Sequence, residues 1–157
     1  MRQANYSATI EGQPPDASVG VRSYHPVGPA INLANVSFRL PGGGVAADRA
    51  LVPPHASTSY PPRDLGIRPA YGMFMRHAHG VSISDTAFRL EAPDSRPVFV
   101  LSDVYDVAFD NVIASRGRDL AYDVEERHGC HNVSTGNLVP GGDRSRTARV
   151  QADTATG

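Results

Sequence analysis

Histidine is the residue type in this 157-residue chain that is best suited to bind a metal or move a proton. Four of the six histidines form two close pairs, His77 with His79 and His128 with His131. His77 and His79 are two residues apart, so on an extended chain their side chains point the same way. Apart from these two pairs, the histidines lack a clustered acid or cysteine partner of the kind that completes a zinc site. We therefore expect no cofactor, no catalytic metal and at most a weak, adventitious zinc site.

Charge and cysteine content exclude several classes of function. The net charge is -1 and every basic residue is arginine, so no basic field is available to attract nucleic acid or a membrane surface. A single cysteine, Cys130, excludes an internal disulfide, and we expect it to be a small buried apolar residue. The apolar runs are too short for a membrane span, and residues 1–7 precede no stretch of the length that a secretory signal needs. We expect neither nucleic acid nor a membrane as a partner.

The elements that must position these residues are short strands. Residues 81–90 alternate apolar and polar side chains, with Val81, Ile83 and Phe88 on the apolar side, which is typical of a strand. Short apolar runs at residues 72–75 and 98–101 flank this segment. Residues 31–40 alternate in the same way and end at the stop Pro41-Gly42-Gly43-Gly44. With 15 glycines and 13 prolines, the composition favours many short strands over long helices.

Three segments are less regular. Residues 6–27 are predicted to form a strand, a turn and a second strand. Residues 45–68 have little periodicity and are predicted to form a long loop. Residues 141–157 are polar without apolar spacing and are expected to be a frayed, flexible tail. At this length we expect one domain, over residues 1–140.

The alternating segment repeats along the chain. Residues 81–88 recur in pattern at 107–114 and, more weakly, at 133–138, in steps of 26 residues, and the same pattern precedes them by 50 residues at 31–38. The same step places His77, Asp103 and Gly129 in one column, and maps Met75 to Leu101 and Val98 to Val124. A period in the mid-twenties suits one rung of a β-solenoid, in which stacked rungs build parallel sheets around a continuous core.

One position of the repeat is always a short polar residue, namely Asn35, Asp85, Asn111 or Asn137. Such a row could supply ligands for an ion or a sugar. The alternative is an asparagine ladder at a corner of the coil, because Asn and Asp tolerate the left-handed backbone region and can bond to the neighbouring turn. Three of the four residues carry no charge, which favours the ladder.

Four elements, in this order, resemble the C-terminal part of bacterial glycoside hydrolase family 28 proteins, the polygalacturonase-like enzymes. They are His25-Pro26-Val27 before residues 31–36, the stop at 41–44, Tyr60-Pro61 before Pro69-Ala70-Tyr71-Gly72 and Arg76-His77, and residues 93–97 before 98–103. The resemblance covers residues 20 to 115. It implies an all-β, right-handed parallel β-helix of four to five rungs, and pectic polysaccharide as the substrate. Family members are often exported.

The chain departs from the family at the catalytic motifs. The family hydrolyses pectic chains with inversion, using an Asn-Thr-Asp segment and an Asp-Asp pair together with His-Gly and Arg-x-Lys segments. Only the dipeptide His-Gly is present, at residues 79–80 and 128–129. Inversion needs two carboxyl groups roughly 6.5–9.5 Å apart. The 26-residue step places Asp85 over Asn111, Asp106 over Asn132 and Glu125 over Phe99, so it stacks no two carboxylates and we assign no catalytic residue.

Four substrate-binding residues follow from the resemblance: Tyr71, Arg76, His77 and Arg96. Arg76 and Arg96 would pair with sugar carboxylates, and Tyr71 would stack on a sugar ring. The alternative is structural. Asp94 and Arg96 would then brace a turn, His77 would satisfy backbone groups at a corner of a rung, and Tyr71 would pack in the core.

Two hypotheses for function remain open. In the first, the chain is the C-terminal β-helix portion of a pectin-degrading glycosidase and is inactive alone because the acid motifs are missing. In the second, it is a non-catalytic carbohydrate-binding or structural β-helix module. Both allow pectic polysaccharide as a partner, and both allow self-association through the exposed edge of the first rung.

Overall fold

Strands supply nearly all the regular structure. The computed structural model describes residues 8–11, 31–53 and 66–150, and the only helix in these ranges is the 3-10 helix η1 (Ala46–Ala50). Every strand pairing among these residues is parallel, and all the strands belong to one sheet. The strands are β1 (Ala8–Glu11), β2 (Ile31–Ala34), β3 (Ser37–Leu40), β4 (Met73–Leu90), β5 (Phe99–Ala114), β6 (Val124–Arg127), β7 (His131–Ser134), β8 (Leu138–Pro140) and β9 (Thr147–Val150). The all-β prediction is confirmed.

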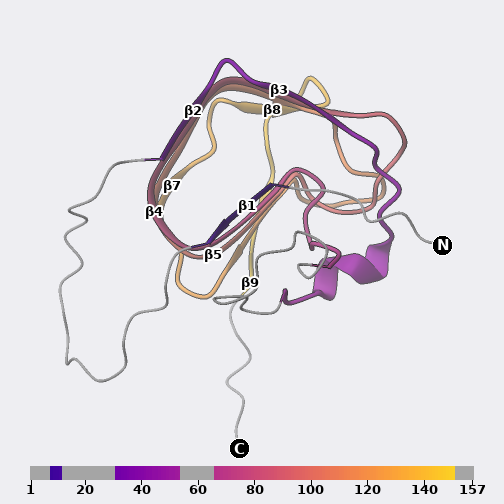
Figure 1. Cartoon of the computed structure of the whole chain (residues 1–157), viewed down its shortest axis with the longest axis horizontal. Coiled ribbons are helices and arrows are strands. Elements are labelled where there is room, and N and C mark those ends of the chain that lie inside the picture. Colours follow the sequence, from indigo (N-terminus) through magenta and orange to yellow (C-terminus); the bar gives the residue numbers. More distant parts are fainter. Residues whose placement is uncertain (1–7, 12–30, 54–65, 151–157) are drawn as a thin grey trace, which may run out of the picture.

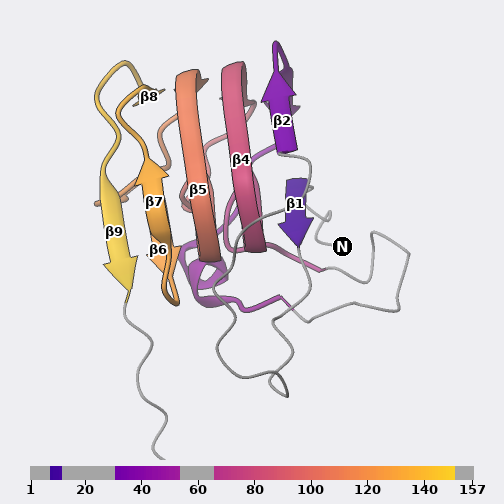
Figure 2. The same ribbon diagram turned by 90° about the vertical axis from the view of Figure 1, so that its left-hand side faces the viewer.

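The strands lie at five successive levels, which stand side by side in Figure 2. The first level holds β1, β2 and β3, each paired with a different part of β4. The second and third levels are the long strands β4 and β5. The fourth holds β6, β7 and β8, paired with successive parts of β5, and the fifth is β9 beside β6. When the stack is viewed end-on, as in Figure 1, the chain follows almost the same path at each level.

The register confirms the 26-residue step over most of the sheet. Val81 lies opposite Val107, and Val107 lies opposite Val133. The 50-residue step is confirmed as well, because Ile31 lies opposite Val81. The mapping of Val98 to Val124 was wrong, since Val124 pairs with Phe99 and the step here is one residue shorter.

The shortened step has a local cause. Ser102 pairs with Arg127 and Tyr105 with His131, so the fourth level has one more residue between these pairs than the third level. The inserted turn has two residues in the left-handed region, His128 at φ 49° and Gly129 at φ 73°. It interrupts what would otherwise be one long strand. Glu125 consequently lies opposite Val100 and not, as we expected, opposite Phe99.

Left-handed residues bend the strands. Asn35, Asp85 and Asn111 have φ values of 57°, 46° and 50°, and they follow the 50- and 26-residue steps. Asn and Asp adopt this conformation at lower cost than most residues. The Asn111 side-chain amide donates to Asp85 Oδ1 at 2.6 Å. The predicted ladder is therefore confirmed between Asp85 and Asn111, whereas Asn137 is not in the left-handed region and its amide donates to Asp110 instead.

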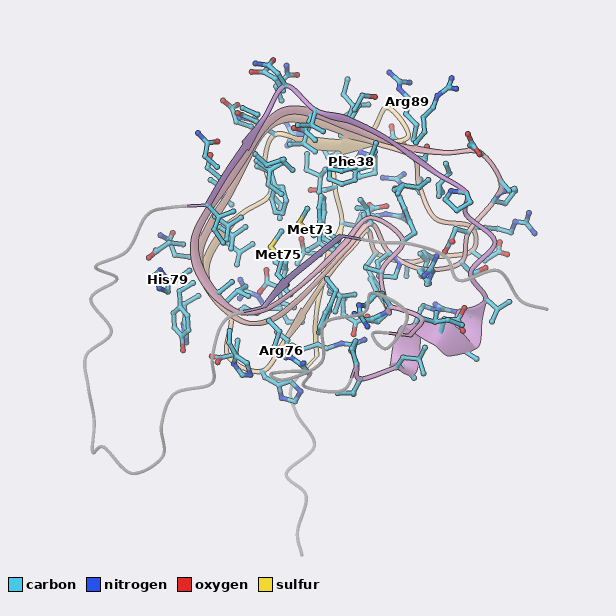
Figure 3. All side chains as sticks on the ribbon, viewed as in Figure 1. Phe38, Met73, Met75, Arg76, His79 and Arg89 are labelled. Carbon is cyan, nitrogen blue, oxygen red and sulfur yellow. The ribbon has the colours of Figure 1, made fainter. Side chains whose placement is uncertain are left out.

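The core lies inside the curved sheet. Phenylalanine rings run across the levels, with Phe38 stacked on Phe88 at 4.9 Å, Phe88 against Phe99 at 5.1 Å and Phe99 against Phe109 at 4.6 Å between ring centroids. Methionine and aliphatic side chains fill the space around the rings, and in Figure 3 Phe38, Met73 and Met75 point inward. In the same view Arg76, His79 and Arg89 point outward.

The segment around η1 covers part of the outer face. Arg76 Nη1 donates to the Pro53 carbonyl at 2.7 Å. Arg127 donates to the carbonyls of Leu51 at 3.1 Å and Arg49 at 2.5 Å. These bonds hold the segment at 45–53 near the second and fourth levels. Within the predicted long loop, residues 49–53 are therefore anchored to the strands.

Two predictions concerned the ends of the chain. The expectation of a loose tail at 141–157 was wrong for β9, because Thr147–Val150 adds to the free edge of β6 and Arg149 pairs with Glu126 at 2.9 Å. Residues 151–157 lie outside the described ranges. At the other end β1 is a strand, while the predicted turn and second strand fall in residues 12–30, which are also outside these ranges. No helix among the described residues is long and apolar enough to cross a membrane.

Candidate functional site

A buried ion pair joins Asp94 and Arg96. Arg96 Nε donates to Asp94 Oδ1 at 3.0 Å and Arg96 Nη2 donates to Asp94 Oδ2 at 2.7 Å. The third guanidinium nitrogen, Nη1, donates to the Arg68 carbonyl at 3.1 Å. Both residues are 1% exposed. Arg96 therefore serves as a brace, as the structural alternative predicted, and it lacks the exposed surface that a contact with a sugar carboxylate requires.

The charge of Asp94 is stabilised inside the protein. Burial opposes ionisation of the carboxyl group, but the hydrogen bonds and charge of Arg96 outweigh burial, and the pKa of Asp94 is lowered. The backbone amides of Gly44 and Arg96 also donate to this carboxylate, each at 2.8 Å. A carboxylate held this way contributes to stability as an anion, which is a structural role.

The ion pair joins the elements that carry the family resemblance. Gly44 ends the stop at 41–44, and a Cβ there would overlap Arg96 Nε and lie 2.7 Å from Asp94 Oδ1. Backbone bonds run from Gly43 N to the Pro93 carbonyl at 3.0 Å and from Ser95 N to the Gly44 carbonyl at 3.0 Å. Glycine is therefore needed at position 44 for a close approach between chain segments at neighbouring levels.

Tyr71 is also enclosed. The residue is 1% exposed, and its hydroxyl donates to the Ser115 carbonyl. Burial, followed by the nearby charges of Asp123 and Asp94, raises the pKa of the phenol. The packing alternative describes this position, because a ring buried to this degree cannot stack on a sugar.

Arg76 and His77 lie closer to the surface. Arg76 is buried under the Pro53 carbonyl, and its guanidinium carbon lies 5.6 Å from the centre of the Phe74 ring. His77 Nδ1 lies 2.6 Å from Asp103 Oδ2, with 22% of the His77 side chain exposed. His77 is at φ 52°, so our premise that residues 77–79 are extended was wrong. Of the four predicted binding residues, only His77 offers a partly exposed side chain.

Three further buried carboxylates, those of Asp123, Glu125 and Glu126, are paired with arginines. Asp123 accepts bonds from Arg116 at 3.0 and 3.2 Å, and from the Arg146 side chain at 3.3 Å. Glu125 accepts from Arg127 at 2.5 Å, and Glu126 accepts from Arg149. In none of the registered strand pairs do two carboxylates lie opposite each other. These buried acids are thus committed to ion pairs and are not arranged as an acid and base pair.

A second cluster, the histidine corner, lies at the bend between levels two and four. It consists of His77, His79, Asp103, Tyr105, His128 and His131. Register places His79, Tyr105 and His131 in one column, and His77 and Asp103 in the next. The Tyr105 and His131 rings stack at 5.2 Å between centroids, and both residues are exposed.

Only part of the histidine corner could be predicted from the sequence. The 26-residue step already aligned residues 79, 105 and 131, yet no pattern of residue types marked Tyr105. The chain bends at both His-Gly dipeptides, inside β4 at Gly80 and between β6 and β7 at Gly129, whose φ values are 64° and 73°. No group of three or more His, Cys, Asp or Glu side chains in the described residues is arranged to hold a metal ion.

Cys130 lies beside the histidine corner. It packs against the core, is half-buried, and burial raises the pKa of its thiol. The expectation of a small apolar residue therefore fits its surroundings only in part, because its sulfur lies 3.1 Å from the Arg127 carbonyl.

No family model matches the chain, and neither a curated protein nor a solved structure matches it.

Proposed function

We propose that the chain is the C-terminal β-helix portion of a polygalacturonase-like glycoside hydrolase, and that it holds pectic polysaccharide without cleaving it. The observation that carries the proposal is the parallel register, with steps of 26, 25 and 23 residues from the second level onward and longer steps of 50 and 65 residues from the first level to β4; steps in the mid-twenties are expected of stacked rungs. The five levels would then be rungs of a right-handed helix, as the resemblance implies.

The proposal of binding without hydrolysis rests on the acids. Inversion needs one carboxylic acid to protonate the leaving oxygen and one carboxylate to activate water. Asp94, Asp123, Glu125 and Glu126 are buried, and each accepts a bond from an arginine. The half-exposed Asp103 is engaged with His77. Catalysis would need acid motifs from further rungs, which the family carries N-terminal to the part that this chain resembles.

A second candidate is a carbohydrate-binding or structural module that works without further rungs. The exposed stack of Tyr105 and His131 favours the binding form of this hypothesis, because ring side chains and neighbouring polar groups are the usual means of holding sugars. An in-frame coding region upstream that contains the acid motifs would favour the hydrolase. A genuine start without such a region would favour the module.

The test combines hydrolysis and binding. The purified chain is incubated with polygalacturonate to measure reducing-sugar release, and beside it with the insoluble polymer in a pull-down. We expect retained protein and no release. Release that disappears in Asp103→Asn would show that an acid of this chain is catalytic. The absence of both signals would leave only the structural form of the second candidate.

A further inference from the structure

We propose that the histidine corner is a binding face for polyanionic sugars that is switched on by acid, with the uronate carboxylates of a pectic chain as its ligand. This inference rests on the proposed function for the identity of the polymer. It goes further by naming the face and its regulation. The observation behind it is that four of the six histidines of the chain lie at one bend across three neighbouring levels.

The geometry of the bend gathers these side chains. His77 and His79 belong to β4, Asp103 and Tyr105 to β5, and His128 and His131 to the turn and strand that follow β6. Adjacent strands lie about 4.8 Å apart, so the column of residues 79, 105 and 131 spans about 10 Å. His79 points outward in Figure 3. A sugar polymer lying across the levels would meet each of these residues in turn.

The charges on the face depend on histidine protonation. The carboxylates of the bend are Asp103 and Asp106, and Asp106 also accepts the Asn132 amide at 2.6 Å. With neutral histidines the bend therefore carries two negative charges, and with four protonated histidines its net charge is two positive. Histidine is the side chain whose ordinary titration falls between pH 5 and 8. Uronate carboxylates remain ionised at pH 5, so acid would turn repulsion into attraction.

The other charged groups near the bend do not prevent its net charge from changing from negative to positive when the histidines are protonated. Arg127 is paired with Glu125, and Arg76 is buried beneath the Pro53 carbonyl. On the inner side Glu126 is paired with Arg149. Asp85 and Asp110 keep their negative charges, because the amides of Asn111 and Asn137 that donate to them are neutral, but they lie six residues beyond His79 on β4 and five residues beyond Tyr105 on β5.

Polar groups beside the histidines would recognise the hydroxyls of the sugar. The phenol of Tyr105 can donate and accept hydrogen bonds, and 37% of the residue is exposed. The Asn132 amide lies at the adjoining corner and has a second N–H beyond the one that bonds to Asp106. A protonated imidazole donates through both ring nitrogens, which suits carboxylates.

The experiment measures binding of the full chain to polygalacturonate and to dextran sulfate, a polyanion unrelated to pectin, at pH 5 and pH 8 and constant ionic strength. The variant H128Q/H131Q changes two exposed residues, and H77Q/H79Q serves as a second variant. R39Q/R89Q is the matched control, because Arg39 and Arg89 are exposed and lie opposite each other away from the bend. Circular dichroism and thermal midpoints verify that each variant folds.

We expect binding to polygalacturonate to be at least tenfold tighter at pH 5 than at pH 8. H128Q/H131Q should lose most of that ratio, while R39Q/R89Q should keep it. A ratio near one, or an unchanged ratio in both histidine variants, would overturn the inference and leave the proposed function standing. Acid-dependent binding of dextran sulfate alone would support the switch and overturn the pectic ligand. If the chain bound neither polymer at either pH, both the inference and the proposed binding of pectic polysaccharide would be overturned.

Discussion

At the scale of single residues, the best-defined interaction is the ion pair of Asp94 and Arg96. Its two charges are almost completely buried and every oxygen of the carboxylate has a partner. A buried pair of this kind can contribute little net stability relative to an apolar pair, yet removing one partner is costly because it leaves a charge without compensation. Each of the two residues therefore contributes to stability chiefly by compensating the buried charge of the other.

The change Arg96→Met should lower the free energy of unfolding by about 3–5 kcal/mol, because Asp94 would remain buried without its cation. Arg118→Met is the control, since the Arg118 side chain is exposed, and it should stay within about 0.5 kcal/mol of the original. Urea denaturation at pH 7 measures both variants. A loss below about 1 kcal/mol for Arg96→Met would contradict the assigned role.

The pH dependence of stability should carry the signature of Asp94. Its pKa is lowered in the folded state, whereas the unfolded value is about 3.9. The unfolded state therefore binds more protons just below pH 4, and the stabilisation present above that pH is lost as the pH falls toward the folded pKa. Urea midpoints at pH 7, 4 and 3 should fall less steeply below pH 4 in Asp94→Asn than in the original chain. An identical slope would show that Asp94 is not a source of acid sensitivity.

At the scale of elements, two glycines differ in how closely other chain segments approach them. Gly44→Ala should cost about 1–3 kcal/mol, because its Cβ would meet an arginine that the bonds to Asp94 hold in place. Gly136→Ala is the matched control, since no heavy atom lies within 4 Å of a Cβ at that position. Thermal unfolding compares the two variants. Equal midpoints would mean that the segment at 41–44 shifts freely away from Asp94.

Much of the element layout could be predicted from the sequence. A strict alternation and a 26-residue step are enough to align Val81, Val107 and Val133, because stacked parallel strands repeat the same inward side chains. Ile31–Leu40 was predicted as one strand, and the left-handed Asn35 divides it into β2 and β3. The one-residue shift at Val124 was not predictable from a constant step, since it depends on a turn inserted at residues 128–130.

The site was less predictable than the fold. Tyr71 and Arg96 carry side chains that suit sugar binding, and residue type alone could not show that neighbouring levels enclose them. β9 was missed because its pairing depends on a free edge at β6 and on the Arg149 contact with Glu126, not on apolar spacing. Tyr105 was missed because no pattern of residue types marked it, although the 26-residue step aligned it with His79 and His131.

At the scale of the whole molecule, a row of phenylalanine rings in the core crosses the first three levels. Phe88 lies between Phe38 and Phe99, so it connects the first level to the third. Phe88→Ala should lower the free energy of unfolding by about 3–5 kcal/mol. Val52→Ala is the control, because Val52 is 74% exposed, and it should change stability by less than about 0.5 kcal/mol. Denaturation in urea with one transition for both variants would verify that the levels unfold together, and a small loss for Phe88→Ala would contradict a shared core.

The two ends of the stack differ in chemistry. At the last level the inward position opposite Glu126 is Arg149, so the interior ends in an ion pair. At the first level the inward residues are apolar, including the half-buried Leu33 and Phe38. Inward-pointing charges discourage edge-to-edge association, and apolar edges do not. We therefore propose that any self-association, or stacking of further rungs, uses the edge of β2 and β3.

Every proposal for this chain depends on parallel levels stacked in register, which residue-resolved amide hydrogen exchange of the full chain would test. We expect the slowest exchange in β4 and β5, which are paired on both sides, and faster exchange in β9, which pairs with β6 alone among the described strands. Amides of β9 protected as strongly as those of β5, or β4 without protection, would contradict the stacked arrangement and the sites built on it.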